Sequence, residues 1–239
     1  ETTRVLHELG LETDVLAVED INRDKKTRKA VKSKVGLVFQ YPEYQLFEET
    51  VARDVAFGPG NLGLKQDEID RRVDSALRQV GLDPAEVAEK SPFELSGGQK
   101  RRVAIAGIIA MEPDVLVLDE PAAGLDPRGR EEIFGNVVDY QRSTGKTVVI
   151  VSHSMEDMAR YAQDLVVLDN GKIAAAGQCR EVFGKKELFT ESGLRVPQVT
   201  SVMEKLKSLG MPVPDDCFTV QEAVQALRPL LSKEGSSRA

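Results

Sequence analysis

Residues 115–120 read VLVLDE, four apolar residues followed by two carboxylates. Short apolar runs that end in charged or turn residues are typical of buried strands. Similar runs predict further strands at residues 35–39, 147–151 and 165–168. Segments with helical spacing lie between or beside these runs, at residues 67–80, 98–111, 130–142 and 155–162. This alternation predicts an α/β fold in which helices cover a mostly parallel sheet.

Polar side chains stand where three of these strands are expected to end. They are Gln40 after the first, Asp119 and Glu120 at the second, and Ser152 and His153 after the third. Ligands bind at the carboxyl ends of strands in open α/β sheets, so we expect one converging site. An amide, two carboxylates and an imidazole suit metal-assisted attack by water. The alternative for the two carboxylates is that they cap the turn at Pro121.

Asp119 and Glu120 are adjacent on a strand end, where alternation points their side chains in different directions. An aspartate held in this way can serve Mg²⁺, directly or through water. The glutamate can orient or deprotonate an attacking water, which is the division seen in phosphate-transfer sites. The pair therefore predicts two separate roles.

Residues 95–99 read LSGGQ and open a predicted helix. The spacing of Ser96 and Gln99 satisfies the capping-box pattern, so a well-made helix start is the purely structural interpretation. However, Gly97 and Gly98 each cost about 1 kcal/mol of helix propensity relative to alanine in a helix interior. Bare N–H groups at the positive end of a helix let a phosphate approach closely, and Ser96 can add a hydroxyl donor. The segment therefore predicts phosphate binding.

Composition excludes several classes of protein. Of the 239 residues, 41% are apolar and 30% charged, which is ordinary for globular domains and unlike disordered or disulfide-framework chains. With its net charge of -7, the chain lacks the overall positive charge that is typical of nucleic-acid-binding proteins. The two cysteines, Cys179 and Cys217, predict inert core thiols in a reducing compartment. Because no apolar stretch could span a bilayer and no leader opens the chain, we expect a cytoplasmic protein that reaches a membrane through a partner.

Together these motifs resemble the nucleotide-binding ATPase subunits of ABC transporters. Residues 95–99 resemble the family signature, residues 115–120 the Walker B strand and residues 123–127 (AGLDP) the D-loop. Gln40 resembles the Q-loop glutamine, and His153 the switch histidine. The resemblance implies a P-loop NTPase-like fold with a helical signature subdomain at about residues 41–111. It also implies ATP and Mg²⁺ as cofactors.

The resemblance assigns roles to single residues. It implies that Glu120 is the general base and His153 the sensor of the γ-phosphate. It also implies that Asp119 coordinates the metal and that Gln40 links the metal site to the transport subunit. The residues expected to bind the nucleotide are Gln40, Leu95, Ser96, Gly97, Gly98, Gln99 and Asp126.

Two longer stretches narrow the resemblance. They look like the ATPases of energy-coupling-factor importers, which take up vitamins and trace metal ions. The two stretches are residues 36–59 (GLVFQYPEYQLFEETVARDVAFGP) and residues 91–107 (SPFELSGGQKRRVAIAG). They are most similar to the second, A-prime, of the two ATPase types. In that family residues 41–47 face the coupling helices of the transmembrane subunit; the alternative for Tyr44, Leu46 and Phe47 is a core-covered loop. Residues 193–226 resemble the C-terminal extension, which contributes to dimerisation.

The resemblance also implies the organisation and partners of the chain. We expect an ABC ATPase domain over residues 1–180 and a small helical extension over residues 181–239. The expected partners are a second ABC ATPase subunit, identical or related, a transmembrane coupling subunit and a substrate-binding membrane subunit. From the resemblance we therefore expect a peripheral subunit at the cytoplasmic face of the membrane.

The amino end departs from the family pattern. The phosphate loop Gly-x-x-x-x-Gly-Lys-Ser/Thr does not precede Gln40. Residues 145–147 (GKT) lack the earlier glycine, since position 140 is Tyr140, and they precede a strand. We interpret them as a helix-end glycine that leads into a strand.

Aligning residues 20–22 with the family places the missing lysine at or just before Glu1. Thr2 or Thr3 would then match the Mg²⁺-binding hydroxyl, and residues 3–11 the remainder of the following helix. The expectation is an N-terminally truncated chain that supports at most one composite ATP site. The alternatives are a catalytically inactive interaction subunit and a soluble, non-transport ABC ATPase of DNA repair or cluster assembly.

Overall fold

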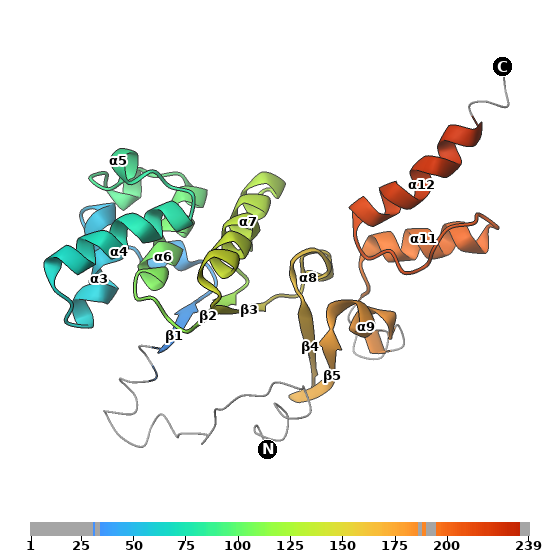
Figure 1. Ribbon diagram of the computed structural model, residues 1–239, viewed down its shortest axis with the longest axis horizontal. Coiled ribbons are helices and arrows are strands. Elements are labelled where there is room, and N and C mark those ends of the chain that lie inside the picture. Colours follow the sequence, from blue (N-terminus) through green and yellow to red (C-terminus); the bar gives the residue numbers. More distant parts are fainter. Residues whose placement is uncertain (1–30, 32–33, 186–187, 190–194, 235–239) are drawn as a thin grey trace. The chain divides into compact units, whose positions relative to one another are not determined.

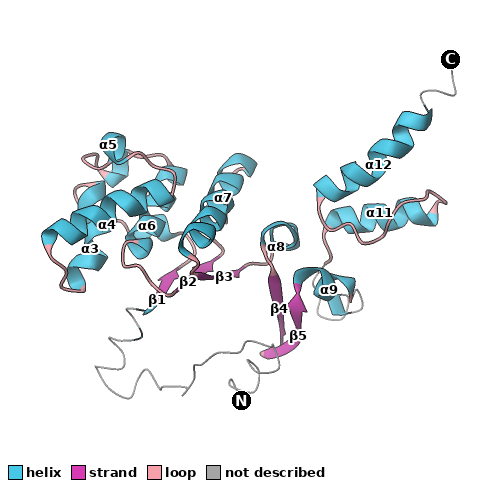
Figure 2. Cartoon of the chain, viewed as in Figure 1, coloured by secondary structure: helices cyan, strands magenta, loops and turns pink. Residues whose placement is uncertain are grey.

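A computed structural model of the chain describes residues 31, 34–185, 188–189 and 195–234 (Figures 1 and 2). The described residues divide into two compact units, one within Leu16–Ser152 and the other within His153–Ala239. The expectations for Glu1, Thr2, Thr3 and residues 3–11 and 20–22 lie outside the described residues. The domain boundary at residue 180 stays a prediction.

The first unit contains a parallel sheet (Figure 2). Its strands lie in the order β1 (Val35–Val38), β2 (Val115–Asp119) and β3 (Thr147–Val151). The register places Val38 opposite Leu118, and Asp119 opposite Val151. All three predicted strands are confirmed, as is their parallel direction. Because the strands run the same way, their carboxyl ends meet at one edge of the sheet.

Helices connect these parallel strands. Between β1 and β2 lie η1 (Pro42–Gln45), α3 (Val51–Asn61), α4 (Gln66–Gln79), α5 (Pro84–Val87), η2 (Pro92–Glu94) and α6 (Gly97–Ile109), and α7 (Pro127–Thr144) joins β2 to β3. Helices α3, α4 and α6 pack against one another (Figure 1). The predicted helices at residues 67–80, 98–111 and 130–142 correspond to α4, α6 and α7, with ends that differ by one to three residues.

The core of this unit follows the periodicities of its elements. In α4, Ile69, Val73 and Leu77 are buried at a spacing of four residues, which places them on one helix face. In β2, Leu116 and Leu118 are fully buried, whereas the residues that alternate with them are half-buried. Alternation along a strand sends successive side chains to opposite faces, so the described helices cover one face of the sheet more fully than the other.

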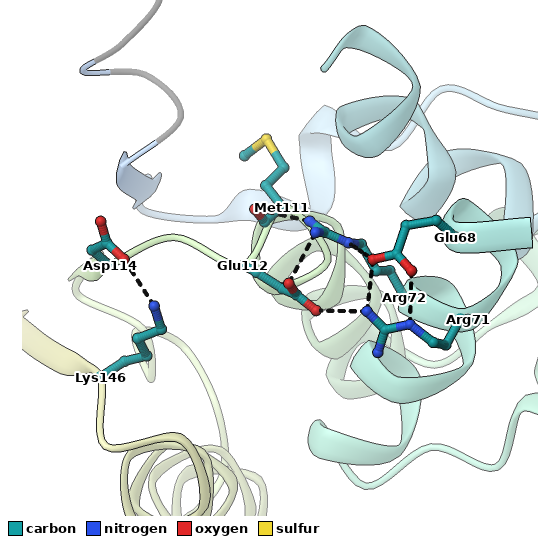
Figure 3. A network of polar contacts seen from close by, with 7 residues as sticks. All are labelled: Glu68, Arg71, Arg72, Met111, Glu112, Asp114 and Lys146. Carbon is teal, nitrogen blue, oxygen red and sulfur yellow. Dashed lines mark hydrogen bonds and ion pairs between the residues drawn. The ribbon is translucent and has the colours of Figure 1, made fainter. Parts of the chain in front are cut away.

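A charged network fixes the turn between α6 and β2 (Figure 3). Glu68 of α4 accepts hydrogen bonds from Arg71 at 2.6 and 2.9 Å and from Arg72 at 2.7 Å. Both arginines also pair with Glu112, which has a φ of 53°. The Arg72 guanidinium donates to the Met111 carbonyl at 3.4 Å. Hydrogen bonds from Arg71 and then Arg72 lower the pKa of Glu68 to about 2.

The second unit begins with α8 (Met155–Tyr161), as the pattern at residues 155–162 predicts. It continues with β4 (Asp164–Asp169) and β5 (Lys172–Gln178), which form an antiparallel hairpin. The strand at residues 165–168 is therefore confirmed, but its expected place in a parallel sheet is not what the described residues show. Strand β5 was not predicted, because KIAAAGQ has few of the β-branched and aromatic residues that favour strands.

A turn signal could have found this hairpin. Asp169 pairs with Lys172, so Asn170 and Gly171 form a two-residue loop. Both loop residues have positive φ, 47° and 73°. Asn-Gly between two strands favours the turn with two left-handed residues, whose twist matches that of the strands.

The small C-terminal helical extension that the resemblance implies is confirmed. It contains α9 (Cys179–Gly184), α11 (Gln198–Ser208) and α12 (Val220–Glu234). Met203, Val213, Cys217 and Ala223 form a small core there. The Thr200 hydroxyl donates to the Cys217 carbonyl at 2.7 Å within it. No helix in the described ranges is long and apolar enough to cross a membrane.

Both cysteines are buried free thiols, as predicted. Burial raises the pKa of Cys179 to about 11 and also raises the pKa of Cys217. Because the thiolate is the nucleophile, we expect a thiol reagent at pH 8 to leave both residues unmodified in the native protein. Spectrophotometric titration should count two thiols only after denaturation. Rapid labelling of the native chain would contradict this expectation.

Candidate functional site

The carboxyl edge of the parallel sheet gathers three of the predicted site residues. Gln40 is exposed two residues beyond β1, and Asp119 is the half-buried last residue of β2. The N–H of Glu120 donates to the carbonyl of Val151 at 2.9 Å, which ties the end of β2 to β3. The Ser152 hydroxyl donates to Oε2 of Glu120 at 3.3 Å. The first unit therefore brings an amide and two carboxylates to one edge, as expected.

Two residues at this edge have backbone conformations that side chains rarely adopt. Tyr41, directly after Gln40, has a φ of 55°, and Glu120 has a φ of 46°. A left-handed conformation of a residue other than glycine costs on the order of 1–3 kcal/mol and persists only where the surroundings hold it. Such strain gathers at functional sites, so its presence beside both strand ends supports a site there.

The helix start at residues 95–99 has the predicted capping box. Ser96 N–H donates to Oε1 of Gln99 at 3.0 Å, and Gln99 N–H donates to Oγ of Ser96 at 3.3 Å. A Cβ at Gly97 or Gly98 would meet no atom of the described residues within 4 Å, and neither glycine has a positive φ. Neither packing among the described residues nor backbone conformation therefore requires these glycines. The Leu95 side chain is buried and anchors the helix start in the core.

Asp126, which is expected to contact the nucleotide, begins α7. Its Oδ1 accepts a hydrogen bond from Gly129 N–H at 2.8 Å, so it is the N-cap of that helix. A Cβ at Gly129 would lie 2.9 Å from this oxygen, which makes the glycine part of the cap. Asp126 remains exposed. Its role toward a nucleotide stays a prediction.

His153 is exposed and opens the second unit. Ser154 follows it as the N-cap of α8, accepting a hydrogen bond from Asp157 N–H at 3.4 Å. Since Glu120 belongs to the first unit, the convergence of His153 with Glu120 stays a prediction.

The residues 145–147 are a helix end, as we interpreted them. Gly145 has a φ of 66° and ends α7, donating its N–H to the Gln141 carbonyl at 2.9 Å. The Lys146 ammonium pairs with Asp114 at 2.8 Å (Figure 3), and Thr147 begins β3. The lysine is therefore held by a surface carboxylate.

Oxygen donors at the sheet edge fit Mg²⁺ bound together with a nucleotide. No cluster of three or more histidine, cysteine, aspartate or glutamate side chains occurs among the described residues. Mg²⁺ commonly takes only one or two protein carboxylates and completes its shell with water and substrate phosphates. Asp119 and the Gln40 amide oxygen match this sparse donor set better than a closed, all-protein metal cage.

Sequence reasoning missed Arg101, a buried residue in α6. It lies in the run Lys100-Arg101-Arg102, which has the composition of a solvated surface, yet its side chain is only 2% exposed. The available signal was helical spacing, because Arg101 stands four and eight residues before the buried Ile105 and Ile109. That spacing places the arginine on the buried face.

Comparisons with known proteins agree with this geometry. The sequence model of the ABC transporter family matches residues 8–123. The energy-coupling factor transporter ATP-binding protein EcfA2 of Clostridium tetani is 48% identical over 224 residues, covering 93% of this chain and 78% of the relative.

Two solved structures are similar as well. CbiO1 of Clostridium perfringens, part of the ABC transporter complex cbiONQ, aligns with a TM-score of 0.66 and 36% identity, covering 85% of this chain and 82% of CbiO1. A dimeric post-hydrolysis structure of the ATP-binding cassette MJ0796, bound to ADP and Pi, aligns with a TM-score of 0.57 and 26% identity, covering 74% of this chain and 80% of the neighbour. On this identity and coverage, the chain belongs to the ATP-binding proteins of energy-coupling factor transporters, within the ABC transporter family.

Proposed function

We propose that this chain is the ATPase subunit of an energy-coupling-factor importer and that it powers uptake of vitamins or metal ions through membrane partners. The observation that carries the proposal is the start of α6. It is a 13-residue helix whose N-terminus has a complete capping box and two glycines facing open space. A helix start of this kind offers unobstructed N–H donors and a positive dipole end to a phosphate.

The carboxyl edge of the sheet supplies the residues proposed to bind the metal and to activate water. Asp119 and Gln40 would hold Mg²⁺, which neutralises phosphate charge when bound. Glu120 would orient or deprotonate the attacking water, and the bonds from its N–H to Val151 and from Ser152 to its carboxylate hold it at the end of β2. His153 would contact the γ-phosphate. These roles fit one another because nucleophile activation and charge neutralisation are the two tasks of such a site.

We infer that ATP lies between two subunits, with the start of α6 offered to the nucleotide of the partner. The exposed Ser96 and Gly97 are accessible to a second molecule. The similarity to a dimeric cassette with ADP and Pi supports this arrangement. The second subunit is an identical or related ATPase, and the helical extension after residue 180 contributes to dimerisation.

An aromatic patch beside Gln40 is the proposed contact with the transmembrane coupling subunit. Tyr44 is 85% exposed, and the exposed rings of Phe47 and Phe57 meet edge to face with centroids 4.9 Å apart. The alternative of a core-covered loop applies only to Leu46, which is buried. Exposed apolar side chains gathered in one place mark interaction surfaces. The transmembrane subunit docked here would place the ATPase at the cytoplasmic face, and a separate membrane subunit would select the solute.

Replacing Tyr44 and Phe47 with serine tests this docking. Both side chains are exposed, so we expect the fold and basal ATP hydrolysis to persist. We expect co-purification with the co-expressed membrane subunits from detergent to fall at least about tenfold, since aromatic anchors dominate binding free energy at interfaces. Leu168→Ser, at another exposed apolar position, is the matched control. Undiminished co-purification of the double variant would remove the patch from the proposal.

A further inference from the structure

One buried arginine joins three segments of the first unit. The Arg101 guanidinium donates to both carboxylate oxygens of Glu43 in η1, at 2.9 and 2.7 Å. Its Nη1 donates to the carbonyl of Pro121 at 3.3 Å and to that of Ala123 at 2.6 Å. It also lies over the ring of Tyr41, 5.6 Å from the centroid. The side chain of Arg101, which belongs to α6, therefore contacts both the segment after β1 and the turn after β2.

The physical chemistry of this contact favours a fixed geometry. A buried charge is tolerated only when it is paired and its donors are satisfied. Arginine can meet a carboxylate with two parallel bonds and still keep donors for two carbonyls. A lysine ammonium has no such fork. Burial alone would raise the pKa of Glu43, but the hydrogen bonds and charge of Arg101 help to hold it below the ordinary value.

The joined segments are those next to the two strained residues. Tyr41, whose φ is 55°, lies under the guanidinium, and a Cβ at Gly124 would lie 3.6 Å from its ring. Glu120, whose φ is 46°, directly precedes the Pro121 carbonyl that Arg101 binds. Strained conformations persist where their surroundings over-determine them. Arg101 supplies such surroundings at both strand ends.

We propose that Arg101 is a positioning residue. Through Glu43 it holds the segment after Gln40 against α6, and through the carbonyls of Pro121 and Ala123 it holds the turn after Glu120 against the same helix. This proposal rests on the proposed ATPase function and names the residue that aligns its parts. Arg101 need not touch the nucleotide. A shift of about 1 Å in reacting groups can cost about 100-fold in rate, so loss of this alignment lowers turnover.

The test uses the full chain with its ATPase partner and three variants, Arg101→Met, Arg101→Lys and Glu43→Gln. For Arg101→Met we expect kcat to fall about 10- to 100-fold, with less than about a threefold change in KM for Mg-ATP. Arg101→Lys restores a charge without the fork, so its kcat should lie between those of Arg101→Met and the unmodified chain. Arg78→Met, on the exposed face of α4, is the matched control and should retain the unmodified kcat.

Amide hydrogen exchange supplies a reading that does not depend on ATP hydrolysis. Loss of Arg101 should speed exchange at residues 122–125 and 41–45 but not in α4. Glu43→Gln is the variant that keeps the fold if Arg101→Met does not, since glutamine preserves the shape and one acceptor. It should still speed exchange at residues 122–125, which are distant in sequence from residue 43. A purely local role of the ion pair would leave that turn unchanged.

The two proposals fail in different ways. If the folded Glu43→Gln and Arg101→Lys proteins keep the unmodified kcat and the unmodified exchange at residues 122–125, the positioning role of Arg101 is wrong and the ATPase function stands. If the unmodified pair of subunits hydrolyses no Mg-ATP, the ATPase function is wrong, and the exchange measurement still decides whether Arg101 aligns the three segments.

Discussion

In a version of the chain that carries the phosphate loop, Glu120→Gln is expected to lower ATP turnover at least about 100-fold, because a positioned general base contributes about 10²- to 10⁴-fold to such reactions. Glutamine has the same shape and can still accept the hydrogen bond that Ser152 donates at 3.3 Å to the carboxylate. The strained backbone and its bond to Val151 do not depend on the carboxylate charge. The variant should therefore bind Mg-ATP normally and remain trapped as an ATP-bound dimer.

Phosphate release under saturating Mg-ATP measures this turnover, and size-exclusion chromatography with and without ATP measures the dimer. Glu49→Gln is a suitable control, since Glu49 is an exposed carboxylate paired with Arg53 on the same unit. Turnover unchanged by Glu120→Gln would remove Glu120 from the role of base. Loss of ATP binding instead of turnover would assign Glu120 to nucleotide affinity.

Gly98→Glu is expected to stabilise the isolated chain and to abolish its ATP-driven dimerisation with an ATPase partner that carries the phosphate loop. Glutamate has better helix propensity than glycine and, in the first turn, interacts favourably with the helix dipole, by about 0.3–1 kcal/mol for the latter. The added side chain enters open space, since a Cβ there meets nothing within 4 Å. The same carboxylate would face the partner's nucleotide phosphates, where like charges in contact cost several kcal/mol, a loss of more than about 100-fold in affinity.

Gly98→Glu should change stability and dimerisation in opposite directions, so a general loss of folding cannot explain the expected result. Thermal unfolding should show an unchanged or higher Tm, while analytical ultracentrifugation should show no ATP-dependent dimer. Gly135→Glu in α7 is the matched control, because a Cβ there also meets nothing within 4 Å. It should dimerise normally. Normal ATP-driven dimerisation of Gly98→Glu would show that the start of α6 does not face a nucleotide.

Arg101 contacts both the segment beside the proposed docking patch and the turn beside the proposed catalytic edge. The segment that it holds through Glu43 leads directly into the exposed Tyr44 and Phe47. The turn that it holds through Ala123 leads to the N-cap of α7 at Asp126.

Features that depend on neighbouring residues along the chain could be predicted from the sequence. Apolar runs predicted the three strands of the parallel sheet, and helical spacing predicted α4, α6 and α7. The capping box at Ser96 and Gln99 and the helix end at Gly145 were equally readable. Each depends on contacts within about one helical turn or on alternation along a strand, and these leave a pattern in consecutive residues.

Contacts between residues far apart in the sequence could be identified only in the folded structure. The contact of Arg101 with Glu43, 58 residues away, was not predicted. A lysine-arginine run has the same composition on a solvated surface as in a core. Only packing that removes water around the guanidinium, and brings a carboxylate and two carbonyls to it, distinguishes the two, because burial of a charge is decided by its partners in space.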